Sequence, residues 1–262
     1  MTDIQPLLPY KILVIGESCK DVYHTGVVDR ISPEAPVPIF KSEKYFEKFG
    51  MAKNVQLNVL ELNQKCDIIT NDNTQIRKER FIDKRFDSQV FRLDINDNCK
   101  PLEVDVLAKS NLSHYDAIIV SDYNKGFITP EAAKFISTSN NCVFVDSKKK
   151  DLTCYEGCFL KINEKEKSEL TKPVNASKLI TTAGKKGAMY LGEMYPAIET
   201  DVFDVCGAGD VFISCLCTFY LHTKDIVKSI KLSNAFASVS VRYSGNYVIK
   251  MEEILSALRN RY

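Results

Sequence analysis

Asp204-Val205-Cys206-Gly207-Ala208-Gly209-Asp210 is the strongest local pattern in the chain, and it leads straight into an apolar helical segment, residues 210–223. Small residues let a backbone approach an anion closely, and the free amides at the start of a helix point towards that anion. A carboxylate in the same turn is placed to take the proton of an attacking hydroxyl group. The alternative is a plain glycine turn in which Asp210 caps the helix. The stretch is not a Walker loop, because no Gly-Lys-Ser/Thr follows it.

On the amino-terminal side of this turn the chain alternates between apolar, β-branched runs and helical patterns. Residues 11–15 (KILVI) indicate a buried strand, since continuous apolar runs suit a sheet that is covered on both faces. Thr129-Pro130 is typical of a helix start, with threonine as N-cap and proline in the first turn. Alternation of this kind predicts an α/β sandwich with a mostly parallel sheet. Further strands are predicted at 117–120, 143–145, 159–162, 179–182 and 189–191, and helices at 51–63, 129–138, 210–223, 225–244 and 251–260.

Two early segments do not follow the alternation. Residues 26–49 are spaced by prolines and then alternate in polarity, which predicts short extended segments. Residues 78–94 carry two strand-like runs around Asp87-Ser88, which predicts a hairpin. Together they indicate a small sheet that is separate from the main one.

The composition is that of a globular protein, with 262 residues, 45% of them hydrophobic and 26% charged. A net charge of +1 gives no field that favours nucleic acid or an anionic membrane, so neither is expected as a partner. Nine scattered cysteines cannot all pair within one chain, which predicts reduced thiols in a cytoplasmic setting. The first residues do not resemble a signal peptide, and no apolar run reaches the ~20 residues of a membrane helix.

Further motifs along nearly the whole chain, in this order, resemble those of the ribokinase-type (PfkB) carbohydrate kinases. Gly16 and Asp21 match the opening of the sugar site, and Gly50-Met51-Ala52-Lys53-Asn54 resembles a glycine-rich substrate motif. Asn163 and Glu166 match an N-x-x-E motif, and residues 182–187 match T-x-G-x-x-G. The resemblance implies a ribokinase-like three-layer sandwich. Residues 1–262 would form one kinase domain with a small β-sheet lid, built from segments near 24–48 and 78–94.

The resemblance also implies a role for each matched residue. Asp210 would be the catalytic base and the amides of Gly207, Ala208 and Gly209 the anion hole, with ATP as cosubstrate and Mg²⁺ as cofactor. Glu166 would contact the metal indirectly. Arg80 and Arg85 are candidate phosphate contacts, and the alternative for both is a solvated hairpin face. The implied substrate-binding residues are Asp21, Gly50, Asn54, Arg80 and Arg85, and the implied nucleotide-binding residues are Asn163, Thr182, Gly184, Gly187 and Asn234.

One segment is similar to a single branch of that family. Residues 30–38 (RISPEAPVP) closely resemble a stretch of the D-glycero-β-D-manno-heptose 7-phosphate kinases, as do 121–126 and 145–148. This implies phosphorylation of the anomeric hydroxyl to the 1,7-bisphosphate, a step of ADP-heptose synthesis. The nucleotidyltransferase step of that route would fall to another chain.

The chain departs from the family pattern at several points. Cys206 replaces a threonine, Lys53 replaces a small residue and Glu17 stands where aspartate is frequent. A helix and strand expected between Asn63 and Arg77 are predicted to be missing, as is another pair between Glu166 and Thr182. Two alternatives therefore stay open: a kinase of this family for another sugar, sugar phosphate or nucleoside, and a catalytically silent binding protein. The lid also predicts a homodimer.

Overall fold

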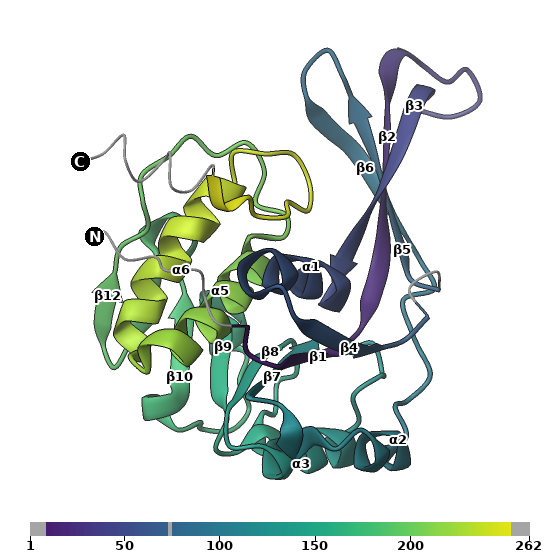
Figure 1. Cartoon of the computed structure of the whole chain (residues 1–262). Coiled ribbons are helices and arrows are strands. Elements are labelled where there is room, and N and C mark those ends of the chain that lie inside the picture. The colour runs from purple at the N-terminus through teal and green to yellow at the C-terminus, as the bar shows by residue number, and fades with distance from the viewer. Residues whose placement is uncertain (1–8, 73–74, 253–262) are drawn as a thin grey trace.

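The computed structural model describes residues 9–72 and 75–252 and contains two sheets (Figure 1). The larger sheet, with the helices, forms the body of the molecule, and the smaller sheet projects from it. Residues 253–260 of the last predicted helix lie outside the described residues.

The larger sheet has the strand order β12-β11-β10-β9-β8-β7-β1-β4. Its strands from β4 to β10 are parallel, and only β11 and β12 run antiparallel to their neighbours. The prediction of a mostly parallel central sheet is therefore confirmed. Its strands are β1 (Ile12–Gly16), β4 (Cys66–Thr70), β7 (Ala117–Asp122), β8 (Val143–Ser147), β9 (Phe159–Asn163), β10 (Leu179–Thr182), β11 (Ala188–Tyr190) and β12 (Glu193–Tyr195).

Helices cover both faces of this sheet, which makes three layers (Figure 1). On one face lie α1 (Ala52–Asn63), α5 (Ala208–Thr223) and α6 (Ile226–Ser240), with α5 packed between the other two. On the other face lie α2 (Val104–Lys109) and α3 (Pro130–Ser139). The Thr129 side chain accepts a hydrogen bond from the amide of Ala132, so the predicted cap of α3 is confirmed.

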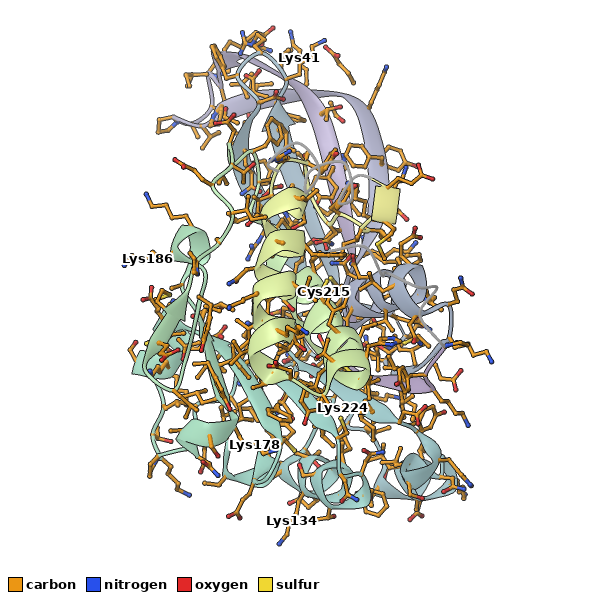
Figure 2. All side chains as sticks on the ribbon, turned by 60° about the vertical axis from the view of Figure 1, so that its left-hand side comes forward. Lys41, Lys134, Lys178, Lys186, Cys215 and Lys224 are labelled. Atoms are coloured by element: carbon orange, nitrogen blue, oxygen red, sulfur yellow. The ribbon has the colours of Figure 1, made fainter. Side chains whose placement is uncertain are left out.

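The hydrophobic core has two parts, one on each face of the large sheet, and alternate residues of the buried strands belong to each part. On β1, Ile12 and Val14 point to the face of α1 and α5, while Leu13 and Ile15 pack with α3 on the other face. A strand that buries both its faces needs an unbroken apolar run, and the sequence of residues 11–15 has this property. Cys215 lies in the middle of the helical layer (Figure 2), and the nine cysteines, all of them described, are free thiols.

The smaller sheet has the order β3-β2-β5-β6. Its strands are β2 (Ser18–Ile31), β3 (Pro38–Met51), β5 (Arg77–Asp83) and β6 (Ser88–Ile95), so the predicted hairpin is confirmed. The residues before 49 are extended, as expected, but the expected short lengths were wrong, because β2 and β3 are 14 residues each and pair along their whole length. Lys41 marks the far end of this sheet (Figure 2).

One other expectation needs correction. A strand is present in the shortened stretch after Asn63, since β4 pairs with β1 as the edge of the large sheet. Helix α2 was not predicted from the sequence. Between Glu166 and β10 the described chain contains only the end of the short helix α4 (Glu164–Ser168) and one 3₁₀ turn, as expected from its length. Within residues 9–72 and 75–252, no helix has the length and apolarity to cross a membrane.

Candidate active site

A cavity of about 890 Å³ opens where β8, β9 and β10 end and α5 begins. Open parallel sheets bind ligands at this edge, because the carboxyl ends of the strands and the amino ends of the helices meet there. The cavity is lined by the glycine-rich turn, by the ends of these strands and by α6. The predicted residues at its wall are Asn163, Thr182, Gly184, Gly187, Gly207, Ala208, Gly209, Asp210 and Asn234.

Asp210 stands in the first turn of α5, and its carboxylate is almost completely buried. Asn54 Nδ2 of α1 donates to Oδ2 at 2.9 Å, and the Tyr123 hydroxyl donates to Oδ1 at 2.9 Å. Gly207 is the N-cap residue of α5, with φ of 76°, and as a glycine it has no side chain that could cap the helix. The carboxylate of Asp210 therefore accepts hydrogen bonds from two groups outside its own helix. Asp210 does not merely cap α5, which was the alternative.

Burial raises the pKa of Asp210 to about 6, and the nearby Asp146 carboxylate adds to the rise. Hydrogen bonds from Asn54 and Tyr123, and the charge of Lys161, act in the opposite direction. A base is most useful when its pKa lies near the working pH, because it is then both ionised and able to hold a proton. Asp210 meets this condition at neutral pH.

A buried lysine that the sequence did not single out lies directly beneath the glycine turn. Lys161 Nζ donates to Asp146 Oδ2 at 2.6 Å, and both side chains are at most 5% exposed. A Cβ atom on Gly209 would stand 2.9 Å from this ammonium group, so glycine leaves room for the cation. The turn thus combines backbone amides with a fixed positive charge, which suits a developing negative charge on a phosphoryl group.

The N-x-x-E motif forms a capping box at the start of α4. Asn163 Oδ1 accepts from the amide of Glu166 at 2.9 Å, and Glu166 Oε2 accepts from the amide of Asn163 at 2.8 Å. Lys148 bridges Glu166 and Asp146 at the wall of the cavity. The Lys148 side chain is therefore held at the cavity.

Two predicted residues support the cavity through the backbone. Gly187 has φ of 104°, and a Cβ atom there would meet the carbonyl oxygen of Tyr195 at 2.1 Å. Asn234 Nδ2 donates to that carbonyl oxygen at 2.7 Å, so it fixes the same stretch of chain from α6. Both residues therefore shape the wall.

A second cluster faces the small sheet, and its centre is Asp21 on β2. Arg80 of β5 forms a buried ion pair with Asp21, and Asn246 Nδ2 donates to Asp21 Oδ2 at 2.6 Å. A Cβ atom on Gly50 would stand 2.1 Å from Asp21 Oδ2, so only glycine fits beside the carboxylate. The alternative of a solvated face for Arg80 is thus wrong, because its side chain is only 12% exposed.

The two clusters meet at Gly207. A Cβ atom there would lie 3.0 Å from Asn246 Oδ1 and 3.1 Å from Asn54 Nδ2, which bonds Asp210. Cys206 Sγ donates to Asn246 Oδ1 at 3.3 Å and lies 3.6 Å from Arg80 Nη2. The thiol that replaces threonine thus belongs to the wall of the Asp21 cluster.

Three residues singled out from the sequence lie away from the two clusters. Arg85 stands in the turn between β5 and β6, where it binds Asp83 and the carbonyl of Val28 and is 43% exposed. The Lys53 amine donates to Gln56 Oε1 at 2.7 Å on the surface of α1. Glu17 is buried and accepts three backbone amides of residues 123–127.

A three-layer α/β fold, a glycine turn with a buried carboxylate, and a large cavity beside it together define a phosphotransferase that acts on a hydroxyl group. The family model of the pfkB family carbohydrate kinases matches residues 91–253. The chain therefore belongs to the pfkB family of carbohydrate kinases.

Curated relatives cover nearly the whole chain. The bifunctional protein HldE of Haemophilus influenzae strain PittEE is 29% identical over 306 residues, and that of Campylobacter curvus is 30% identical over 308 residues. Each alignment covers 96% of this chain, but only 64% and 65% of the respective relative. The chain thus spans somewhat less than two thirds of the curated relatives that it matches.

Solved structures confirm the fold. A ribokinase from Thermotoga maritima superposes with a TM-score of 0.74 at 18% identity and covers 96% of this chain and 100% of its own. Phosphofructokinase-2 from Escherichia coli gives 0.73 at 13% identity, with coverage of 96% and 99%. The predicted ribokinase-like sandwich is therefore confirmed.

Proposed function

We propose that this kinase transfers the γ-phosphoryl group of ATP to the anomeric hydroxyl of D-glycero-β-D-manno-heptose 7-phosphate. The observation that carries the proposal is the position of Asp210. Its buried carboxylate lies between the large cavity at the strand ends and the Asp21 cluster beneath the small sheet. A base between a nucleotide and a sugar has the placement that phosphoryl transfer needs.

Cationic side chains support a phosphorylated sugar over a free one. Lys48 of β3 and Lys78 and Arg80 of β5 belong to the small sheet and lie close to the Asp21 cluster. Arg80 is paired with Asp21, while Lys48 Nζ donates to the carbonyl of Ser244 at 2.7 Å, and burial lowers the pKa of Lys48. A partly buried ammonium group gains from an anionic partner, and a substrate phosphate is such a partner.

In the proposed reaction Asp21 and Asn54 would orient the sugar through its hydroxyl groups. Asp210 would accept the proton of the anomeric hydroxyl as its oxygen attacks the γ-phosphorus, and the bond from that phosphorus to ADP would break. The amides of Gly207, Ala208 and Gly209 and the Lys161 ammonium would stabilise the charge on the transferring group. The nucleotide would lie along residues Asn163, Thr182, Gly184, Gly187 and Asn234.

The residues fit a magnesium ion only in an indirect role. Within the described residues no group of three or more His, Cys, Asp or Glu side chains is arranged to hold a metal. Glu166, which pairs with the cavity residue Lys148, would reach the ion through water, and the nucleotide phosphates would supply most ligands. When bound, Mg²⁺ would neutralise charge on the phosphates.

The test is a panel of sugars and sugar phosphates with ATP and magnesium, read out as ADP release. We expect heptose 7-phosphate to turn over with the highest kcat/KM. Turnover of another acceptor while heptose 7-phosphate is inert would favour the alternative of a kinase for another sugar, sugar phosphate or nucleoside. Nucleotide binding without turnover of any acceptor would favour a silent binding protein.

The small sheet also supports the proposal of a homodimer through this sheet. It exposes Tyr45, Phe91 and Leu93, with 68%, 47% and 44% of their surfaces accessible. Tyr45 lies on β3, and Phe91 and Leu93 lie on β6, the two edge strands of this sheet. Exposed apolar side chains gathered on one part of a protein often mark an interface. Sedimentation at micromolar concentration should show a dimer, and Tyr45→Glu should shift it towards monomer. A monomer throughout the concentration range would refute this proposal.

A further inference from the structure

Tyr123 is the first residue after β7, and its side chain reaches the proposed catalytic base. Its hydroxyl donates to Asp210 Oδ1 at 2.9 Å, while Asn54 holds Oδ2. Tyr123 also lines the large cavity beside Asp210. Burial raises the pKa of the phenol well above its ordinary value, so the group stays protonated and can only donate to the carboxylate.

The backbone that carries Tyr123 is fixed by a buried acid. Glu17, which is fully buried, accepts the amide of Tyr123 at 2.8 Å and the amides of Lys125 and Phe127 at 3.1 and 3.2 Å. One carboxylate thus gathers three amides of a five-residue stretch. The loop is therefore held in one conformation from inside the protein.

The ring of Tyr123 lies between the two halves of the site. Lys78 Nζ, from the small sheet, is 5.3 Å from the ring centroid, and Lys148 Nζ, from the cavity wall, is 5.5 Å from it. Cations are attracted to the face of an aromatic ring at such distances. The ring thus contacts one cation from the small sheet and one from the cavity wall, and both contacts favour its observed position.

We propose that Tyr123 is a positioning residue for Asp210. The Tyr123 hydroxyl stabilises the ionised form of the Asp210 carboxylate and orients its remaining lone pairs towards the acceptor hydroxyl. An ionised carboxylate offers about four acceptor positions, so two remain for the substrate after Asn54 and Tyr123 are bound. The inference rests on the proposed role of Asp210 as base.

Several other charged groups act on Asp210 and must be kept constant in any test. Asp146 of β8 raises its pKa, and Lys161 of β9 lowers it. Cys19 of β2, whose pKa burial raises, also lies within the electrostatic reach of Asp210, and Lys78 and Lys148 contact the Tyr123 ring. Loss of the Tyr123 donor alone removes one group that favours the charged carboxylate, so the pKa of Asp210 should rise.

Tyr123→Phe is the discriminating variant, because it removes one oxygen atom and keeps the ring. The acidic limb of the kcat/KM profile, expected near pH 6 in the wild type, should move upward by roughly one pH unit. At pH 6 the variant should lose about fivefold in kcat/KM, rising towards about tenfold at lower pH, and it should regain most of this above pH 8. The matched control is Tyr155→Phe, since the buried Tyr155 hydroxyl donates to a different carboxylate, Asp122 Oδ2, at 2.6 Å.

A limb that stays in place in Tyr123→Phe, or that moves equally in Tyr155→Phe, would overturn the inference. A second readout needs no turnover: the titration of Asp210 followed by carbon-13 NMR of aspartate-labelled protein, with the signal assigned through Asp210→Asn. A higher midpoint in Tyr123→Phe supports the inference even if no sugar is phosphorylated, and an unchanged midpoint contradicts it even if the kinase is active.

Discussion

Asp210→Asn is expected to lower kcat by roughly 10²- to 10⁴-fold, the usual contribution of a general base. Asparagine keeps the size of the side chain and can still bond Asn54 and Tyr123, but its amide cannot take the proton of the acceptor hydroxyl. KM for ATP should change little, because the cavity proposed to bind the nucleotide keeps its other lining residues. The check is steady-state ADP release with the best acceptor of the panel. Unchanged turnover would remove Asp210 from its role.

The same variant should not be less stable than the wild type at neutral pH. The folded-state pKa of Asp210 is raised, from 3.8 to about 6, so the buried charge opposes folding once the pH exceeds the unfolded value. This penalty grows as pH rises from about 4 to about 6 and is fully present at pH 7. It amounts to at most roughly 3 kcal/mol. Asp210→Asn should therefore melt higher at pH 7, with the difference shrinking at pH 4. A large drop in melting temperature at pH 7 would mean that lost activity reflects unfolding.

Arg80→Met is expected to lower kcat/KM for the sugar phosphate by about 10²-fold or more, in line with 2–5 kcal/mol for truncating one partner of a buried charge pair. The change leaves Asp21 without its cation and removes a positive charge from the sugar side. KM for the sugar phosphate should rise while KM for ATP stays constant. Stability should fall as well, because a buried carboxylate loses its partner.

Arg85→Met is the control for that experiment, as it removes an arginine five residues further along the same hairpin. Arg85 pairs with Asp83 in the hairpin turn, outside the two clusters; because Asp83 is buried, the variant is expected to lose some stability without a change in the site. Its kcat/KM should stay within about twofold of the wild type. Equal losses in both variants would contradict the assignment of Arg80 to the sugar side.

The sequence predicted those helices and strands whose pattern lies within a few neighbouring residues. Residues 11–15 predict a two-sided buried strand from composition alone, and Thr129-Pro130 predicts the start of α3. The strand β4 and helix α2 were missed because both are short and only weakly patterned. The length of β2 and β3 was missed because prolines suggested interruptions, whereas long-range pairing overrides such local preferences.

The same distinction, between patterns of neighbouring residues and contacts between distant ones, applies to the candidate site. The glycine turn and Asp210 are contiguous in sequence, so they could be singled out as a candidate site, although the depth of burial and the hydrogen bonds to the carboxylate could not be predicted. Tyr123 and Lys161 contact this turn from strand ends far away in the chain, and although residues 121–126 resemble the family, no local pattern links either residue to Asp210. The pairing of Arg80 with Asp21 likewise follows from the register of β2 with β5.

Phosphorus-31 NMR of the reaction with ATP and D-glycero-β-D-manno-heptose 7-phosphate tests the central claim most directly. The claim predicts one new phosphate resonance, coupled to the anomeric proton, that appears as the γ-phosphate of ATP disappears and is absent with Asp210→Asn. Consumption of ATP without a new sugar phosphate, or a phosphate on another carbon of the heptose, would contradict it.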